Sequence, residues 1–228
     1  RELDQNFMKL ALSLACKAEG SVSPNPMVGA VVVKSGKVIA KGHHKQAGLP
    51  HAEIIALRKA GKKAWGAHLY VNLEPCCHYG KTPPCIESII AAGIKRVVIG
   101  IRDPNQIVNG KGIRYLRKNS IEVVTGVLKR DCERLNESFF KYIRTGRPWV
   151  ILKSALSLDG KIATWTGDSQ WITGPKTRDY VHQLRNSVDA ILVGAGTVRA
   201  DNPRLTVRLK NGDIRNPARV IVAGKKVI

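Results

Sequence analysis

Two short stretches of the chain carry residues suited to a catalytic zinc site. The first is His51-Ala52-Glu53, and the second runs from Glu74 to Cys85 and contains three of the five cysteines. One histidine and two thiolates hold Zn²⁺ tetrahedrally and leave the fourth position to water. A glutamate beside the histidine then remains free to move protons. These residue types therefore predict metal-assisted hydrolysis, with Glu53 as the general acid and base.

The spacing decides which cysteines are assigned to the metal. The common pattern in zinc nucleobase deaminases is H-x-E followed by P-C-x-x-C. Here Pro75-Cys76 begins the second half, but the next cysteines are Cys77 and Cys85. Adjacent residues are awkward ligands for one metal ion, so we predict His51, Cys76 and Cys85 as the ligands. The alternative is a structural zinc site, which would need a fourth protein ligand such as Cys77 or His78.

The loop between these cysteines carries a resemblance to a known family. After His-Ala-Glu the chain has the pattern Pro-Cys-x-x-x-Gly-Lys-Thr-Pro-Pro-Cys, which begins at Pro75. This pattern resembles the deaminase half of the bifunctional riboflavin-biosynthesis deaminase/reductase, in which the second cysteine is displaced by such an insertion. The same loop separates the chain from cytidine deaminases and transfer-RNA adenosine deaminases, to which it is otherwise similar.

The resemblance implies a set of substrate-binding residues around the zinc. These are Asn25, His44, His78, Lys81, Asp103 and Asn105. Amides and a carboxylate suit the exocyclic groups of a polar pyrimidine, and Lys81 suits a phosphate. Turn chemistry alone would also explain Asn25 between two prolines and Asp103 before one.

The last third of the chain resembles the reductase half of the same family, whose fold is similar to dihydrofolate reductase. The match covers 152–163, 171–173, 193–198 and 201–206. It implies NADPH as a second cofactor, with Gly194 and Thr197 on its side. On the substrate side it implies Lys153, Ser169, Trp171, Thr173, Arg185, Asp201, Leu205 and Arg208. Plain surface charge would also explain Arg185 and Arg208, and Asp201 would also serve as a cap.

Hydrophobic periodicity predicts elements that bring these residues together. In the first 146 residues we expect helices over 3–19, 51–63, 84–92, 112–118 and 129–144, and strands over 27–33, 38–42, 69–73, 97–101 and 121–125. Alternating strands and helices indicate a sheet with helices on its faces, and ligands bind at the carboxyl ends of such strands. The zinc residues and Asp103 fall at these ends.

Thr145-Gly146-Arg147-Pro148 interrupts the pattern and predicts a domain boundary, with a deaminase domain over 1–146 and the N-terminal part of a reductase domain over 147–228. In the second domain we expect strands over 149–155, 190–193 (buried) and 219–223, and a helix over 175–186. The family's reductase half continues beyond this point. We therefore expect either a piece of a longer protein or a deaminase with an inactive reductase remnant.

Composition and charge narrow the class of protein. The 228 residues include 38 Lys and Arg against 17 Asp and Glu, a formal net charge of +21. The basic residues are spread along the chain with few aromatics between them, which argues against a dedicated nucleic-acid surface and favours anionic ligands. No apolar run approaches the roughly 18 residues that span a bilayer. Few, clustered cysteines suit a reducing compartment, so we expect a cytoplasmic protein without a membrane partner.

The alternation of strands and helices predicts an α/β protein. The family resemblance implies a cytidine-deaminase-like three-layer α/β/α domain followed by an incomplete dihydrofolate-reductase-like α/β domain. The function that the resemblance implies is zinc-dependent deamination of 2,5-diamino-6-ribosylamino-4(3H)-pyrimidinone 5′-phosphate, then NADPH-dependent reduction of the ribosyl chain, in a homo-oligomer. Two alternatives stay open. One is a transfer-RNA or nucleobase deaminase, and the other is a non-enzymatic RNA-binding protein with a structural zinc.

Overall fold

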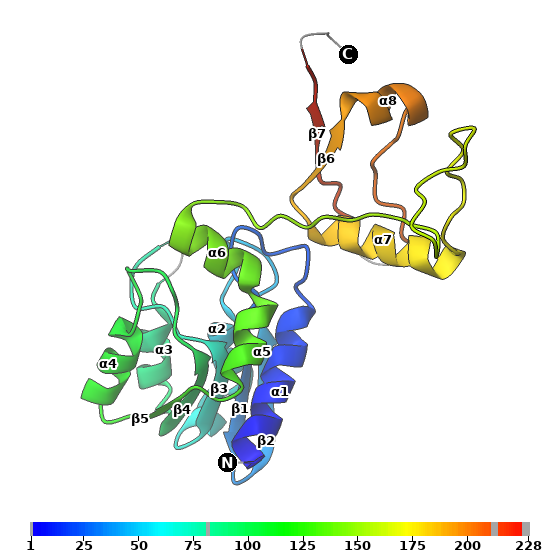
Figure 1. Ribbon diagram of the computed structural model, residues 1–228. Helices are drawn as coiled ribbons and strands as arrows, with labels where there is room; N and C mark the ends of the chain where they lie inside the picture. The colour runs from blue at the N-terminus through cyan, green and yellow to red at the C-terminus, as the bar shows by residue number, and fades with distance from the viewer. Residues whose placement is uncertain (1, 81–82, 211–213, 225–228) are drawn as a thin grey trace. The chain divides into compact units, whose positions relative to one another are not determined.

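The computed structural model describes residues 2–80, 83–210 and 214–224, which form two compact units, Arg1–Trp149 and Val150–Ile228 (Figure 1). Within this described part of the chain, no helix combines the length and apolar character needed to cross a membrane.

The first unit is built on one mixed sheet with the strand order β2-β1-β3-β4-β5. The strands are β1 (Gly29–Lys34), β2 (Lys37–His43), β3 (His68–Leu73), β4 (Arg96–Ile101) and β5 (Glu122–Thr125). Strand β1 runs antiparallel to β2 and β3, whereas β3, β4 and β5 are parallel. The tight β1–β2 turn is made by Ser35 and Gly36, both with positive φ, as the predicted hairpin requires.

Helices cover both faces of this sheet. They are α1 (Glu2–Cys16), α2 (Ala52–Ala60), α3 (Cys85–Ala91), α4 (Lys111–Lys118), α5 (Lys129–Leu135) and α6 (Glu137–Thr145), with a 3₁₀ turn at Gly61–Ala64. The first five correspond to predicted helices, and the 3₁₀ turn replaces the end of the helix predicted over 51–63.

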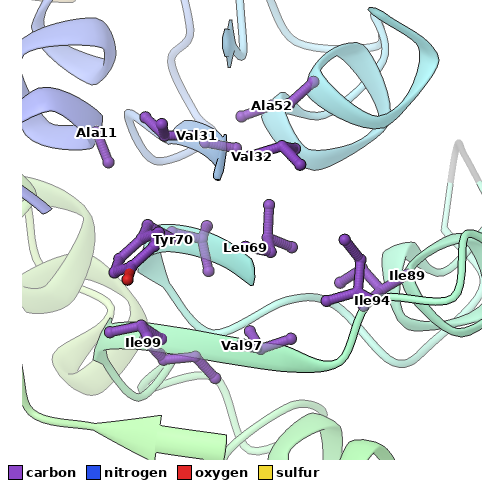
Figure 2. Close-up of a cluster of buried hydrophobic side chains, with 14 of the residues drawn as sticks. Ala11, Val31, Val32, Ala52, Leu69, Tyr70, Ile89, Ile94, Val97 and Ile99 are labelled. Atoms are coloured by element: carbon purple, nitrogen blue, oxygen red, sulfur yellow. The ribbon is translucent and has the colours of Figure 1, made fainter. Parts of the chain in front are cut away.

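Two glycines show how closely the helices approach the sheet. A Cβ on Gly29 would lie 2.0 Å from the carbonyl oxygen of Ala11 in α1, and one on Gly42 would lie 2.3 Å from that of Ala52 in α2. Gly42 pairs with Ala30, the neighbour of Gly29, so the two glycines face opposite sides of the sheet. Figure 2 shows Ala11 and Ala52 on the two sides of β1. The predicted three-layer α/β/α architecture is therefore confirmed.

The helix predicted over 129–144 is two helices, α5 and α6, which meet at Asn136. Asn136 leaves the helical conformation, with φ −112° and ψ 25°. Its buried side chain accepts a hydrogen bond from the backbone N–H of Met27 (2.7 Å) and donates one to the carbonyl of Met27 (2.9 Å). Periodicity within 129–144 carries no sign of this contact, because its partner lies more than 100 residues away in the chain.

The second unit contains α7 (Pro175–Ser187), β6 (Ala190–Gly194), α8 (Ala195–Asp201) and β7 (Ala218–Val222). Strands β6 and β7 form a parallel pair (Figure 1). The strand predicted over 149–155 is wrong: this segment is irregular, and Leu152 is 93% exposed. Strand β6 exists, but its residues alternate between exposed and half-buried rather than being buried. A two-stranded pair has too little neighbouring structure to bury both of its faces.

Replacing Asn136 by alanine tests the contact that separates α5 from α6. We expect Asn136→Ala to lower the free energy of unfolding by about 1–3 kcal/mol, because the Met27 N–H loses its acceptor. Urea unfolding followed by fluorescence measures this change.

Asn119→Ala is the matched control, because Asn119 is exposed and its side chain donates, among the described residues, to the Tyr115 carbonyl on the preceding helix. The control should stay within about 0.5 kcal/mol of wild type. Equal midpoints for the two variants would contradict the role given to Asn136.

Candidate active site

Three segments that are distant in the sequence deliver the predicted metal ligands. His51 is the N-cap residue of α2, Cys76 follows the carboxyl end of β3, and Cys85 is the first residue of α3. Pro84 caps α3 in an extended conformation, which suits a proline at the edge of a helix. The carboxyl end of β3 and the N-termini of α2 and α3 therefore lie together, on the side of the sheet where the parallel strands end.

The three side chains have the spacing of a zinc ligand set. His51 Nδ1 lies 3.2 Å from Cys85 Sγ and 3.5 Å from Cys76 Sγ. Zn–S bonds of about 2.3 Å and Zn–N bonds of about 2.0 Å at a tetrahedral angle put nitrogen and sulfur about 3.5 Å apart. Among the described residues, this is the one group of three His, Cys, Asp or Glu side chains whose ligand atoms lie within 4.8 Å of one another. The residues fit a zinc ion in chemistry and in spacing.

The two ligand cysteines differ in acidity. The Cys85 thiol, the His51 ring and the Cys85 backbone N–H, which lies 3.2 Å from Cys76 Sγ, together hold the pKa of Cys76 well below its usual range. The Cys76 thiolate and burial raise the pKa of Cys85 well above its usual range. The pair thus carries one negative charge by itself. Binding of a divalent cation as a bis-thiolate complex would release the second proton.

Glu53 lies in the first turn of α2 with its side chain buried to 3% exposure. Burial, followed by the negative charge of Cys76, raises the pKa of Glu53 to about 7. A carboxyl group with a pKa near neutrality both accepts and donates protons at physiological pH. Its position two residues after His51 puts this group beside the metal ligands.

A cavity of about 350 Å³ in the first unit collects the predicted site residues. Its lining includes the ligands His51 and Cys76, the proposed acid-base residue Glu53, and five of the six substrate residues, namely Asn25, His44, His78, Asp103 and Asn105. The sixth, Lys81, lies outside the described residues. The apolar walls come from Val28, Leu49, Leu73, Val108 and Phe139, none of which the sequence analysis singled out.

His44 is held neutral and in one tautomer. Its Nδ1 lies 3.2 Å from the carbonyl of Pro50 and its Nε2 lies 3.0 Å from Asn25 Nδ2. The carbonyl only accepts, so Nδ1 carries the proton and Nε2 accepts from the amide of Asn25. Burial lowers the pKa of His44. One of the two amide N–H bonds of Asn25 is therefore used by His44, which leaves the second N–H and the carbonyl oxygen for a ligand.

Asp103 is a buried carboxyl group on the cavity wall. Its Oδ1 accepts a hydrogen bond from the backbone N–H of Asn105 at 2.8 Å. Burial raises the pKa of Asp103 to about 6, although the Asn105 bond acts in the opposite direction. His78 also faces this cavity, and its Nδ1 is buried without a hydrogen-bond partner among the described residues. Both side chains are thus prepared for polar groups of a ligand.

Cys77 and Glu74 flank the Cys76 ligand in the sequence but differ in their surroundings. Cys77 Sγ lies 3.8 Å from the carbonyl of Ile107 and is not in the group with metal-ligand spacing. Glu74 was missed by the sequence analysis, yet it is buried and lines the cavity. The available signal was an acidic residue directly after an apolar strand and two positions before Cys76.

The predicted reductase residues are spread over several segments of the second unit. Most of them are exposed, including Lys153, Ser169, Gly194, Thr197 and Asp201. The structure brings some of the others together in two groups. The Arg178 guanidinium lies 4.4 Å from the Trp171 ring centroid and donates to the carbonyl of Thr173. Arg185 and Arg208 both bond Thr206 and approach His182, whereas Leu205 has a positive φ next to them.

Comparisons with known proteins match the two parts of the chain to two different families of domain. Residues 1–101 match the family model of the cytidine and deoxycytidylate deaminase zinc-binding region, and residues 148–227 match that of the RibD C-terminal domain. The chain is 54% identical to the riboflavin biosynthesis protein RibD of Aquifex aeolicus and 45% identical to that of Escherichia coli. These matches cover 97% and 96% of this chain but 62% and 63% of the relatives, so the chain spans about three fifths of their length.

Solved structures give the same picture. A diaminohydroxyphosphoribosylaminopyrimidine deaminase/5-amino-6-(5-phosphoribosylamino)uracil reductase from Thermotoga maritima is 54% identical and superposes with a TM-score of 0.91 over 96% of this chain and 63% of that one. Acinetobacter baumannii RibD is 44% identical, with a TM-score of 0.94 over 100% of this chain and 65% of that one. The fold class predicted for each half is confirmed by these similarities.

Removing one ligand thiol tests the metal assignment. We expect Cys85→Ala to lose the zinc that wild type retains at about one ion per chain, because two remaining protein ligands bind the ion too weakly. Metal analysis after dialysis against a weak chelator measures the content. Cys77→Ala is the control and should retain zinc, so loss in both variants or in neither would overturn the assignment.

Ionisation of the buried Asp103 side chain should lower the free energy of unfolding at neutral pH. A carboxyl group whose pKa is about 6 when folded and ordinarily 3.8 makes stability fall as the pH rises through this window. We expect Asp103→Asn to raise the free energy of unfolding by up to about 3 kcal/mol at pH 7.5 and by less as the pH approaches 4. Urea unfolding at several pH values measures this difference. The exposed Asp131→Asn should show no such trend, and a pH-independent effect of Asp103→Asn would contradict the argument.

Proposed function

This chain belongs to the RibD family of riboflavin biosynthesis proteins, and on that premise we propose that its first unit is a zinc-dependent deaminase of a phosphorylated aminopyrimidine. The proposed substrate is 2,5-diamino-6-ribosylamino-4(3H)-pyrimidinone 5′-phosphate. The observation that carries the proposal is the single cavity in which two metal-ligand side chains, a buried Glu53 and five polar residues converge. A structural zinc site would have no need of the cavity or of Glu53.

His51, Cys76 and Cys85 would hold the zinc ion, which supplies activation of a water molecule as the nucleophile. Hydrolytic deamination adds the oxygen of water to the ring carbon and releases the amino group as ammonia. Glu53 would accept one proton from the attacking water and pass it to the ring nitrogen. It would then take the second proton from the hydroxyl group of the adduct and pass it to the amino group, which leaves as ammonia. Burial raises the pKa of Glu53 toward neutrality, which suits a group that both accepts and donates protons.

The cavity residues orient the pyrimidine by their remaining hydrogen-bonding capacity. Asn25 offers its carbonyl oxygen and its second N–H to the substrate, because one N–H already serves His44. Asp103 and Asn105 stand on the same loop and suit exocyclic amino and carbonyl groups, and the unpartnered His78 Nδ1 suits a further polar group. We assign Lys81 to the phosphate on chemical grounds.

For residues 147–228 we propose the N-terminal part of an NADPH-dependent reductase domain, following a deaminase domain over 1–146. Its reaction would be reduction of the ribosyl chain of the deaminated product to the ribityl form. Gly194 and Thr197, at the junction of β6 and α8, are proposed on the cofactor side. Lys153, Ser169, Trp171, Thr173, Arg185, Asp201, Leu205 and Arg208 are proposed on the substrate side. The support is the family match over 148–227.

We further propose a cytoplasmic, homo-oligomeric protein. Thiolate ligands persist in a reducing compartment. Strands β2 and β5 form the two edges of the main sheet, and sheet edges are surfaces for pairing or covering by another chain. Light scattering on the purified protein measures the oligomeric state directly.

Glu53→Gln tests the proton-transfer role. The amide cannot accept the proton, so we expect deamination to fall about 10²- to 10⁴-fold while zinc content stays unchanged. Initial rates of ammonia release, with metal analysis of the same samples, give both quantities. Turnover near the wild-type rate would show that another group moves the proton.

The identity of the reaction is tested by mass spectrometry of products from zinc-loaded protein incubated with the diaminopyrimidine ribosyl phosphate and NADPH. A deaminated, unreduced product would support the first activity and show that this chain does not perform the second. A deaminated and reduced product would support both. Unchanged substrate from folded, zinc-replete protein would reject the proposal and direct the search to transfer RNA.

A further inference from the structure

Glu74 is a buried acidic residue that the proposed chemistry does not use. It follows the last residue of β3, and its side chain is 3% exposed. Its backbone N–H donates to the carbonyl of Ile101 at the end of β4. The side chain therefore lies at the carboxyl end of the two central parallel strands, where the cavity opens.

Both oxygens of Glu74 are bound by backbone N–H groups. Oε2 accepts from Asp103 at 3.3 Å and from Gly110 at 2.9 Å, and Oε1 accepts from Ile113 at 3.2 Å. Gly110 is the N-cap residue of α4, and Ile113 lies in its first turn. A helix N-terminus presents free N–H groups and a positive dipole, so a carboxylate is the side chain that suits it best.

A single oxygen atom thus joins the two ends of one loop. Residues 103–110 leave β4 and return to α4, and the N–H groups of the first and the last of them converge on Glu74 Oε2. The loop carries the side chains of Asp103, at its first position, and Asn105, both of which line the cavity. The loop is further ordered by the Asp103–Asn105 bond and by the bond from Ile107 N–H to Asn105 Oδ1.

The same residue is fixed to the metal side of the cavity. Cys76 is only two positions away along the chain, with Pro75 between them. Helix α4 packs directly on this turn, because a Cβ on Gly112 would lie 2.5 Å from the carbonyl oxygen of Pro75. Any displacement of Glu74 would therefore move the Cys76 turn relative to the 103–110 loop.

We propose that Glu74 is the positioning residue that sets the 103–110 loop, with Asp103 and Asn105, in register with the Cys76 turn. It acts through backbone groups rather than on the substrate, since its acceptors already serve three N–H donors. The expected kinetic effects rest on the proposed deaminase function. The expected effects on the structure of the loop rest only on the hydrogen bonds of Glu74.

Glu74→Gln keeps the shape of the side chain but replaces one acceptor by an NH₂ donor that faces backbone N–H groups. We expect kcat/KM for deamination to fall about 10- to 100-fold, the size of effect that a misplacement of about 1 Å produces. Zinc content should remain at the wild-type level. Glu87→Gln is the matched control. Glu87 is exposed on α3 and, within the described part of the chain, accepts a hydrogen bond from the Tyr79 hydroxyl, so this variant should leave kcat/KM unchanged.

A double-mutant cycle separates positioning from general stability. If Glu74 acts through Asp103, the losses in kcat/KM caused by Glu74→Gln and Asp103→Asn will be less than multiplicative in the double variant, because both disturb one contact set. Independent, multiplicative losses, or a folded Glu74→Gln enzyme with wild-type kcat and KM, would overturn the proposal.

Amide hydrogen exchange tests the same inference without activity. In wild type, the amides of Asp103 and Gly110 should be protected although they lie outside the strand and helix ladders. In Glu74→Gln this protection should be lost while that of β3 persists. Unprotected amides in wild type would overturn the proposal even if Glu74→Gln failed to fold. If the Asp103 and Gly110 amides are protected in wild type but wild type shows no deaminase activity, the proposed function is rejected and the positioning contacts of Glu74 still hold.

Discussion

The tetrahedral spacing of one imidazole and two thiols is the constraint on which the rest of the first unit depends. Nitrogen and sulfur ligands must converge to about 3.5 Å, yet His51, Cys76 and Cys85 come from three segments of the chain. Such convergence needs rigid elements whose ends coincide. The sheet provides it, because β3 delivers Cys76 at the edge where α2 and α3 begin with His51 and Cys85 as terminal residues. Close packing at Gly42 sets the approach of α2 to the sheet and thereby the position of His51.

The electrostatics of the cavity follow from crowding acidic groups at that edge. Burial is the main cause of the raised pKa values of Glu53 and Asp103, and the charge of Cys76 adds to both. For the pKa of Cys85 the hydrogen bond with Cys76 comes first and burial second. Glu74 adds a carboxylate whose charge is met only by backbone dipoles among the described residues. A buried cluster of this kind is costly for folding and is typical of functional sites. It also explains why the pocket suits a cation together with a proton-carrying side chain.

Site residues could be predicted from the sequence where the chemistry allows few residue types. Features that depend on contacts between residues far apart in the chain could not. His51, Glu53, Cys76 and Cys85 were selected because zinc hydrolysis admits few residue types, and strands such as 69–73 and 97–101 were evident from continuous apolar runs. The break at Asn136 was not visible, since it depends on Met27 far away in the chain. Glu74 was missed for the same reason: only the fold reveals that three backbone N–H groups surround it. The strand expected over 149–155 failed because apolar residues form a strand only where another strand pairs with them.

The two units differ in how far their proposed sites are built from their own residues. The described residues that line the cavity, from Pro24 to Phe139, belong to the first unit, and hydrogen bonds within that unit hold Asn25, His44 and Asp103. In the second unit, most of the proposed reductase residues are exposed, and only some of them come together, in two small groups. The proposed deaminase assignment thus rests on the geometry of the first unit, whereas the proposed reductase assignment rests on the family match over 148–227. The two proposed activities therefore depend on separate observations. Absence of reductase activity would not affect the proposed zinc site of the first unit.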